Sequence, residues 1–230
     1  MRTTKFDDVI AFPRLSEAQI ERARKYQAAI LSDVAGRRGA LHSSIKPLRN
    51  DMQVVGTAFT VESRPGDNLM FHVALALAKP GDVIIVAGQG YASSAMFGEL
   101  MVTQAEAAGI GGFVVDGASR DFDTIGNSRM PIFAAGRNPA GPTKNIGGKI
   151  CCPISLGDVA VQPGDLVVGD CDGVVVIPRQ EVDTVLEAAE KKVQAEQERM
   201  KEIEQGILVS PWLDDALRAA GVIAANETLM

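Results

Sequence analysis

The chain has 230 residues, of which 46% are hydrophobic and 23% are charged. This composition is typical of a globular protein and excludes disorder of the whole chain. Its 23 basic and 29 acidic side chains give a formal net charge of −6. A general surface for nucleic acid or for an anionic membrane is therefore not expected, whereas a local cationic site for an anionic metabolite is compatible with this balance.

Targeting and redox features of the sequence predict a cytoplasmic protein. No apolar run reaches the length of a membrane-spanning helix, and residues 1–8 lack the apolar core of a signal peptide. The cysteines form neither a disulfide framework nor a recognisable metal-binding spacing; they are Cys151, Cys152 and Cys171. With only two histidines, a typical zinc site or a Ser/His/Asp triad is not expected.

The first predicted element is a helix over residues 16–36, where apolar residues recur at helical spacing. Ser16 and Gln19 suit a capping box at its start, and Gly36 suits a stop. The elements expected next are a strand at 53–63, a helix at 69–78, an apolar strand at 83–87, a loop at 88–91, a helix at 97–108, an apolar strand at 112–116 and a helix from near Asp121.

The later part of the chain is richer in strands. Expected there are a short strand at 131–134, a Gly/Pro-rich loop at 136–149, successive strands over 153–178 with a hairpin turn at 172–173, a charged helix at 181–204 and a short helix at 211–220. This order predicts an α/β fold with a mixed, strongly curved sheet and helical arms at both ends. We expect one domain over 1–230, with a core at about 25–180 and a C-terminal arm from 181.

A Pro-Gly-Asp triplet occurs three times, at 65–67, 80–82 and 163–165. Proline presets φ and glycine accepts a positive φ, so the triplet predicts turns. The residues that flank each copy differ, which argues against a true internal repeat.

Arg120 and Asp121 are the residues best suited to chemistry, because they follow a buried strand across a turn of small residues. Ligands tend to bind at the carboxyl ends of such strands. An arginine grips a carboxylate with two parallel hydrogen bonds, and an aspartate can bind a hard cation through oxygen. The alternative interpretation is that Asp121 caps the next helix while Arg120 pairs with it locally.

Seven stretches of the chain match one known family, in order, over most of residues 25–180. They are LSDVAGRRGAL (31–41), VVGTAFTV (54–61), PGDNLMFHVAL (65–75), PGDVIIVAG (80–88), GELMVTQAEAAGIGGFVVDGASRD (98–121), FAAGRNPAGPTK (133–144) and ISLGDVAVQPGDLVVGDCDGVVVIPR (154–179). In these stretches the chain resembles the RraA-like superfamily. It is most similar to the branch of 4-hydroxy-4-methyl-2-oxoglutarate / 4-carboxy-4-hydroxy-2-oxoadipate aldolases.

The resemblance implies a single αββα-type sandwich related to swivelling domains, assembled as trimers or hexamers with sites between subunits. It also implies a lyase that depends on Mg²⁺ or Mn²⁺. Such an enzyme cleaves 4-hydroxy-2-oxo acids and releases pyruvate through a metal-stabilised enolate, and it decarboxylates oxaloacetate as well. Two alternatives stay open: a non-catalytic regulator that binds a ribonuclease or another protein, and a binding trimer with a vestigial site. No glycine-rich cofactor motif supports a methyltransferase.

The family pattern of an acid or glycine, twenty intervening residues and Arg-Asp falls on Glu99, Arg120 and Asp121. By this resemblance Asp121 binds the metal, and Arg120 contacts the oxo-acid end of the substrate. The backbone N–H groups of Leu100 and Met101 would hold the pyruvoyl carboxylate, since a helix N-terminus binds anions without a cationic side chain.

Further site residues follow from the same resemblance. Acids from a neighbouring subunit correspond to Asp33 and Glu196, although Glu196 also suits a solvated helix face, and Glu198 and Glu202 lie nearby. Asn68 follows a turn that leads into a helix and could reach the site. His72 is interpreted as a packed or hydrogen-bonded histidine rather than a ligand, and Lys144 either approaches an anionic substrate or is solvated.

One position departs from the family pattern. Many family members carry an acid three residues after the metal-binding aspartate, where this chain has Thr124. A threonine hydroxyl is not a base near neutral pH. We therefore expect aldol cleavage to be impaired more than oxaloacetate decarboxylation, unless Asp33, Glu99 or Glu196 supplies the base.

Overall fold

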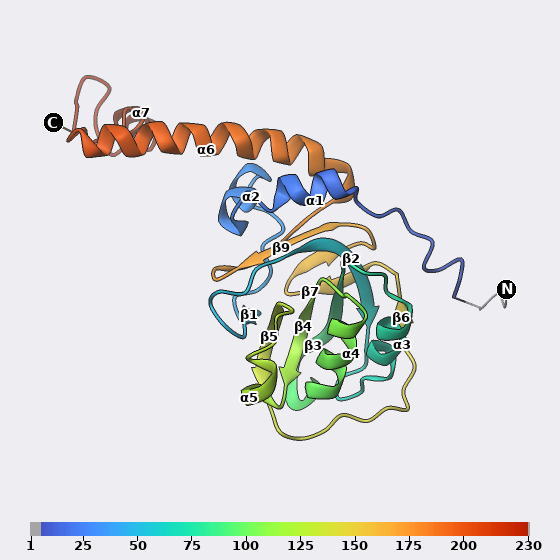
Figure 1. Cartoon of the computed structure of the whole chain (residues 1–230). Coiled ribbons are helices and arrows are strands. Elements are labelled where there is room, and N and C mark those ends of the chain that lie inside the picture. The colour runs from blue at the N-terminus through green and yellow to red at the C-terminus, as the bar shows by residue number, and fades with distance from the viewer. Residues whose placement is uncertain (1–5, 230) are drawn as a thin grey trace. The chain divides into compact units, whose positions relative to one another are not determined.

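A computed structural model describes residues 6–229 of the chain. The chain divides into two compact units, one that runs to Ala189 and one that begins at Glu190. The first unit contains the whole sheet, and the second contains the distal part of a long helix and a short helix (Figure 1). Within residues 6–229 no helix is both long enough and apolar enough to cross a membrane.

The helices are α1 (Glu17–Ala23), α2 (Ala28–Val34), α3 (Leu69–Leu77), α4 (Glu99–Ala107), α5 (Phe122–Ile125), a 3₁₀ turn (Arg179–Glu181), α6 (Val182–Glu204) and α7 (Leu213–Ala219). The strands are β1 (Lys46–Pro47), β2 (Val54–Glu62), β3 (Asp82–Phe97), β4 (Gly112–Ser119), β5 (Ile132–Arg137), β6 (Lys149–Ile150), β7 (Ile154–Leu156), β8 (Val159–Val161), β9 (Leu166–Asp170) and β10 (Gly173–Ile177).

The main sheet is mixed and strongly curved. Its strand order is β1-β5-β4-β3-β2-β9-β10, with β6 paired to β2 outside this path, while β7 and β8 form a separate hairpin. Strands β2 to β5 run parallel, whereas β9 is antiparallel to β2 and β1 to β5. Lys46 of β1 donates a hydrogen bond to the carbonyl of Asp172 in the β9–β10 turn, so the curved sheet nearly closes. The predicted α/β class with a curved mixed sheet is confirmed.

Each face of the sheet carries its own core, because alternate residues of a strand point to opposite sides. Ile84 and Val86 of β3 belong to the cluster that α3 and α4 cover, whereas Val83 and Ile85 belong to the cluster under β7–β10. Helices α3 and α4 lie on the same side of the sheet (Figure 1). In the first cluster the rings of Phe71, Phe97 and Phe113 meet edge to face, with centroids 4.8–5.9 Å apart.

Two predicted boundaries are wrong. The single helix expected over 16–36 is two helices, α1 and α2. Gln27 is extended between them, and the buried Asp170 carboxylate accepts a hydrogen bond from the Ala28 N–H, 2.8 Å away, at the start of α2. The loop expected at 88–91 is part of β3, which bends there and pairs again with β4 from Tyr91. The capping box at Ser16 and the left-handed stop at Gly36 are confirmed.

Candidate active site

A pocket of about 90 Å³ opens beyond the carboxyl ends of β3 and β4. It lies between the first turns of α3 and α4, the β4–α5 connection and the Gly/Pro-rich loop after β5. The residues that line it are Asn68, His72, Phe97, Gly98, Leu100, Met101, Arg120, Asp121, Pro142 and Lys144. Several residues predicted from sequence, far apart in the chain, therefore share one cavity.

Asp121 is held in an uncommon backbone conformation that turns its carboxylate toward α4. Its φ is 58° and its ψ 39°, in the left-handed region that few residues other than glycine adopt. One carboxylate oxygen accepts the N–H of Glu99 at 3.0 Å. Asp121 occupies the N-cap position of α5, but its side chain makes no capping hydrogen bond to that helix, so this part of the alternative interpretation is wrong. Instead it caps the first N–H of α4. The other part is confirmed, since Arg120 forms a local ion pair with Asp121 at 3.6 Å.

Gly98 allows this close approach. A Cβ at Gly98 would overlap the carboxylate of Asp121 and would lie 2.9 Å from Cγ of Arg120. Glycine is therefore the residue that lets Arg120 and Asp121 sit against the start of α4.

The guanidinium of Arg120 keeps its hydrogen-bonding capacity for a ligand. Its Nε lies 3.6 Å from the Asp121 carboxylate, beyond hydrogen-bond distance. Among residues 6–229 the guanidinium has no other charged or hydrogen-bonded partner, and 42% of the side chain is exposed. The planar fork is therefore free to bind a carboxylate or an oxo oxygen with two donors.

The N-terminus of α4 supplies a second group that attracts anions. The Leu100 N–H has no hydrogen-bond partner among the described residues, whereas the Met101 N–H donates to the Gly98 carbonyl at 3.2 Å. Unpaired N–H groups in the first turn, together with the helix dipole, favour a bound carboxylate. Of the two amides predicted to hold the substrate, Leu100 is the one that is free in this conformation.

Two buried polar atoms in residues of the pocket wall also lack partners. The side-chain nitrogen of Asn68 donates to the Met96 carbonyl at 2.8 Å, but its Oδ1 has no partner, and neither does Nε2 of His72. Burial, and then the charge of Lys144, lowers the pKa of His72, which favours the neutral imidazole. A buried polar atom without a partner costs about 1–3 kcal/mol, so a ligand that satisfies it gains affinity.

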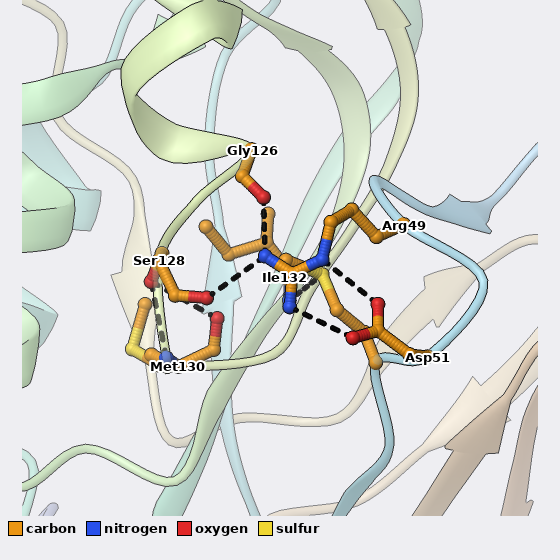
Figure 2. A network of polar contacts seen from close by, with 7 residues as sticks. Arg49, Asp51, Gly126, Ser128, Met130 and Ile132 are labelled. Carbon is orange, nitrogen blue, oxygen red and sulfur yellow. Dashed lines mark hydrogen bonds and ion pairs between the residues drawn. The ribbon is translucent and has the colours of Figure 1, made fainter.

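A network behind the pocket holds the far end of α5. Arg49 forms a two-pronged ion pair with Asp51, at 2.8 and 3.2 Å, and also donates to the carbonyls of Gly126 and Ser128 (Figure 2). Gly126 ends α5, whose first residue follows Asp121. The network therefore fixes the α5 segment that continues from the site.

The donor set suits a hard divalent cation that keeps most of its water. Asp121 is the one acid whose side chain lines the pocket, and the described residues contain no group of three or more His, Cys, Asp or Glu side chains able to hold a metal. A soft metal that needs an all-protein cage does not fit this site. Mg²⁺ fits better, because it is commonly bound through one or two carboxylates plus water and substrate oxygens.

Comparison with known proteins identifies the family of this chain. The RraA-like family model, described as Aldolase/RraA, matches residues 13–176. The chain belongs to the RraA-like family. A relative from Halalkalibacterium halodurans, provisionally named 4-hydroxy-4-methyl-2-oxoglutarate aldolase, is 40% identical over 197 residues, which are 84% of this chain and 94% of that protein.

Two solved structures share the fold of this chain. An uncharacterized protein from Pseudomonas syringae has a TM-score of 0.77 at 29% identity, over 85% of this chain and 92% of that one. Streptomyces coelicolor RraAS2, described as an unusual member of the RNase ES inhibitor RraA protein family, has a TM-score of 0.75 at 25% identity, over 82% and 98%.

Three residues assigned from the family pattern do not line the pocket of a single chain. Glu99 contributes its backbone N–H to Asp121, but its side chain is not part of the lining. Asp33 is exposed on α2, away from the residues that line the pocket within 6–229. Glu196 belongs to the second unit, where it pairs with Lys192 at 2.9 Å. Their roles at a site shared between subunits stay predictions.

His72 lines the pocket although the predicted site did not include it. It lies four residues after Asn68, its Nε2 is buried without a partner, and whether it contacts a ligand stays a prediction. Residues four apart on a helix lie on the same face, so this spacing was a usable signal. No sequence pattern places Gly98 and Pro142 at the pocket, because they reach it through contacts that form only in the folded chain.

Proposed function

We propose that this chain is a divalent-metal-dependent lyase. It would cleave 4-hydroxy-2-oxo acids of the 4-hydroxy-4-methyl-2-oxoglutarate or 4-carboxy-4-hydroxy-2-oxoadipate type, release pyruvate, and decarboxylate oxaloacetate. One observation carries the proposal: Arg120, Asp121 and the free amide of Leu100 converge on one small pocket. The similarity to the Halalkalibacterium protein supports the aldolase interpretation.

In this proposal the pocket binds the 2-oxo acid end of the substrate. The carboxylate lies at the start of α4, where the Leu100 N–H donates to it. Arg120 directs its fork to the same end and stabilises the negative charge that develops as the C–C bond breaks. A divalent cation at Asp121 would supply further positive charge to the oxo oxygen.

The two reactions differ in their need for a base. Aldol cleavage requires removal of the proton from the 4-hydroxyl, whereas loss of CO₂ from oxaloacetate does not. Thr124 is exposed on α5 and does not line the pocket of the described chain. We propose that the base for aldol cleavage comes from a neighbouring subunit, with Asp33 and Glu196 as the candidates.

We also propose assembly as a trimer or hexamer, in which a neighbouring subunit would add acids to the single carboxylate that lines the pocket of one chain. The three cysteines, Cys151, Cys152 and Cys171, are free thiols, and this supports a cytoplasmic location.

The deciding experiment measures pyruvate release from oxaloacetate and from both aldol substrates, with Mg²⁺, with Mn²⁺ and with EDTA. We expect activity with either metal, its loss in EDTA, and its recovery when metal is restored. Asp121→Asn keeps the shape of the side chain and removes the negative charge, so it should abolish the metal response. Full activity in EDTA would overturn the metal-dependent mechanism.

A regulator that binds a ribonuclease is the second candidate, because RraAS2 shares the fold and is described as belonging to an inhibitor family. Failure to release pyruvate from all three substrates, together with inhibition of a purified ribonuclease E-type enzyme, would favour it.

A further inference from the structure

The three Pro-Gly-Asp turns of this chain have different partners. All three aspartates are buried: Asp67, Asp82 and Asp165 are 0%, 1% and 3% exposed. Asp82 accepts hydrogen bonds from Arg14 and from the Lys79 N–H, at 2.8–2.9 Å. Asp82 is the first residue of β3, whereas the pocket lies beyond the last residue of that strand. We therefore assign Asp82 a structural role.

Asp165 also has its partners outside the pocket, and among the described residues its carboxylate accepts hydrogen bonds from backbone N–H groups alone. It accepts the N–H groups of Gln162 at 2.8 Å and Arg179 at 2.9 Å. Asp165 therefore stabilises the turn before β9 and the segment after β10, and neither contributes a residue to the pocket lining.

Asp67, in contrast, ties the start of α3 to the loop after β5. Its Oδ1 accepts the Leu69 N–H at 2.9 Å. Its Oδ2 accepts the Thr143 hydroxyl at 2.7 Å and the N–H groups of Asn145 and Ile146 at 2.9 and 3.1 Å. One buried carboxylate thus satisfies four donors, three of them 76–79 residues away in sequence.

Backbone hydrogen bonds reinforce the same junction. The Asn68 N–H donates to the Thr143 carbonyl at 3.0 Å, and the Thr143 N–H donates to the Gly66 carbonyl at 2.8 Å. Asn68 is the residue after Asp67, and Lys144 lies between Thr143 and Asn145, which both donate to the Asp67 carboxylate. Asn68 and Lys144 both line the pocket. The carboxylate therefore holds two pocket residues, from separate segments, on either side of itself.

We propose that Asp67 is a positioning residue of the oxo-acid site, which acts by fixing Asn68 and Lys144 where they meet the bound anion. The inference deepens the proposed function and rests on it for the identity of the ligand. Asp67 does not line the pocket, so its effect is indirect. Lys144 lines the pocket and forms no ion pair within the described residues, so its charge is available to an anion bound there.

The ionisation of Asp67 agrees with this role. Burial acts to raise the pKa of the carboxyl, but the hydrogen bonds from Thr143 and from the three N–H groups outweigh it and lower the pKa. In Asp165 burial prevails, and the pKa is raised. An asparagine at position 67 would present an NH₂ group to at least one donor that the carboxylate now satisfies.

The test compares Asp67→Asn with the matched control Asp165→Asn and with Lys144→Met. The dissociation constant of pyruvate is measured by calorimetry in the presence of Mg²⁺, together with kcat and KM for oxaloacetate and with Tm. We expect Asp67→Asn to weaken pyruvate binding about tenfold, which corresponds to one lost charge-assisted contact. Asp165→Asn should lower Tm without changing pyruvate affinity.

A double-mutant cycle separates positioning from general destabilisation. In the Lys144→Met background, Asp67→Asn should weaken pyruvate binding by much less than in the wild-type background, because the cation that it positions is already gone. If Asp67→Asn does not fold, Thr143→Val removes one donor from the same carboxylate and should change affinity in the same direction. Additive effects, an unchanged affinity in Asp67→Asn, or an equal loss in Asp165→Asn would overturn the inference.

The two proposals fail differently. If the wild-type protein binds pyruvate but releases none from any substrate, the proposed reaction is wrong, while the affinities still test Asp67. If the wild-type protein does not bind pyruvate, the positioning role at an oxo-acid site is wrong as well.

Discussion

Arg120 and Asp121 are neighbours in the chain, yet the fold gives their side chains different tasks. One carboxylate oxygen of Asp121 accepts the first N–H of α4, whereas the Arg120 guanidinium forms no hydrogen bond within the described residues. Asp121 takes up this position in a left-handed backbone conformation, and both side chains lie beside Gly98. Both residues line the pocket, as the proposed site requires.

The free fork of Arg120 leads to the first prediction. Arg120→Lys keeps the charge but loses the planar pair of donors, so kcat/KM for oxaloacetate should fall about 10²–10³-fold. Arg129→Lys, away from the pocket, is the matched control and should behave like the wild type. Equal activity of Arg120→Lys and the wild type would rule out the bidentate role.

His72 leads to the second prediction, on the pH dependence of stability. Burial, and then Lys144, lowers the pKa of the folded state below the ordinary value of 6.5. Folding therefore favours the neutral ring, and this contribution to the free energy of unfolding is present above pH 6.5 and declines as the pH falls below it. His72→Gln should flatten that decline in urea titrations between pH 5 and 8, whereas the exposed control His42→Gln should retain it.

Helix α4 contributes its N-terminus to the site, and its position depends on one close contact. The carboxylate of Asp121 caps the helix where Gly98 leaves room for it. The distal end of α4 is also anchored, since Glu106 accepts the Ser128 hydroxyl at 2.7 Å and the Arg129 N–H at 3.0 Å. Both ends of the helix are thus tied to the chain that follows β4.

The third prediction concerns Gly98→Ala. The added methyl group would overlap the Asp121 carboxylate and displace the cation site, so Mn²⁺ affinity and kcat should both fall, with kcat reduced about 10²-fold. Gly147→Ala is the matched control, because a Cβ there meets nothing within 4 Å. Calorimetric titration with Mn²⁺ and the pyruvate assay provide the two measurements. Normal metal binding in Gly98→Ala would contradict the proposed cation site.

At the scale of the whole molecule, the predicted acids do not gather at the pocket within the described residues of one chain. Asp121 is the single acid that lines the pocket, while Asp33 lies elsewhere on the first unit and Glu196 belongs to the second. If sites form between subunits, a complete site needs Asp121 from one chain and Asp33 from another. This requirement can be tested without knowing the geometry of the assembly.

The fourth prediction is complementation between inactive variants. Mixing Asp121→Ala chains with Asp33→Ala chains, under conditions that exchange subunits, should restore part of the activity. Mixing Asp121→Ala with Arg120→Ala should restore none, since both residues belong to the same face of one chain. Absence of recovery in the first mixture, with exchange demonstrated by mass spectrometry, would place the site within a single chain.

Local sequence was enough to predict most elements of this protein. The apolar strands near 83–87 and 112–116 and the helix near 69–78 carry their own periodicity and turn signals, and the structure confirms them. The class of fold follows from their order. The spacing between Glu99 and Arg120-Asp121 matches the family pattern and can be recognised in the sequence alone. It predicts the part of the chain where the pocket lies.

Tertiary structure decided the rest, since the deciding contacts join residues far apart in sequence. Asp170 sets the start of α2, 142 residues before it, and pairing with β4 extends β3 through a stretch that looks like a loop. The partners of Asp67 are likewise distant, so its Pro-Gly-Asp triplet cannot be distinguished from the other two by sequence. Periodicity reports which face of an element is apolar, whereas the hydrogen bonds left free for a ligand depend on which distant groups the fold brings together.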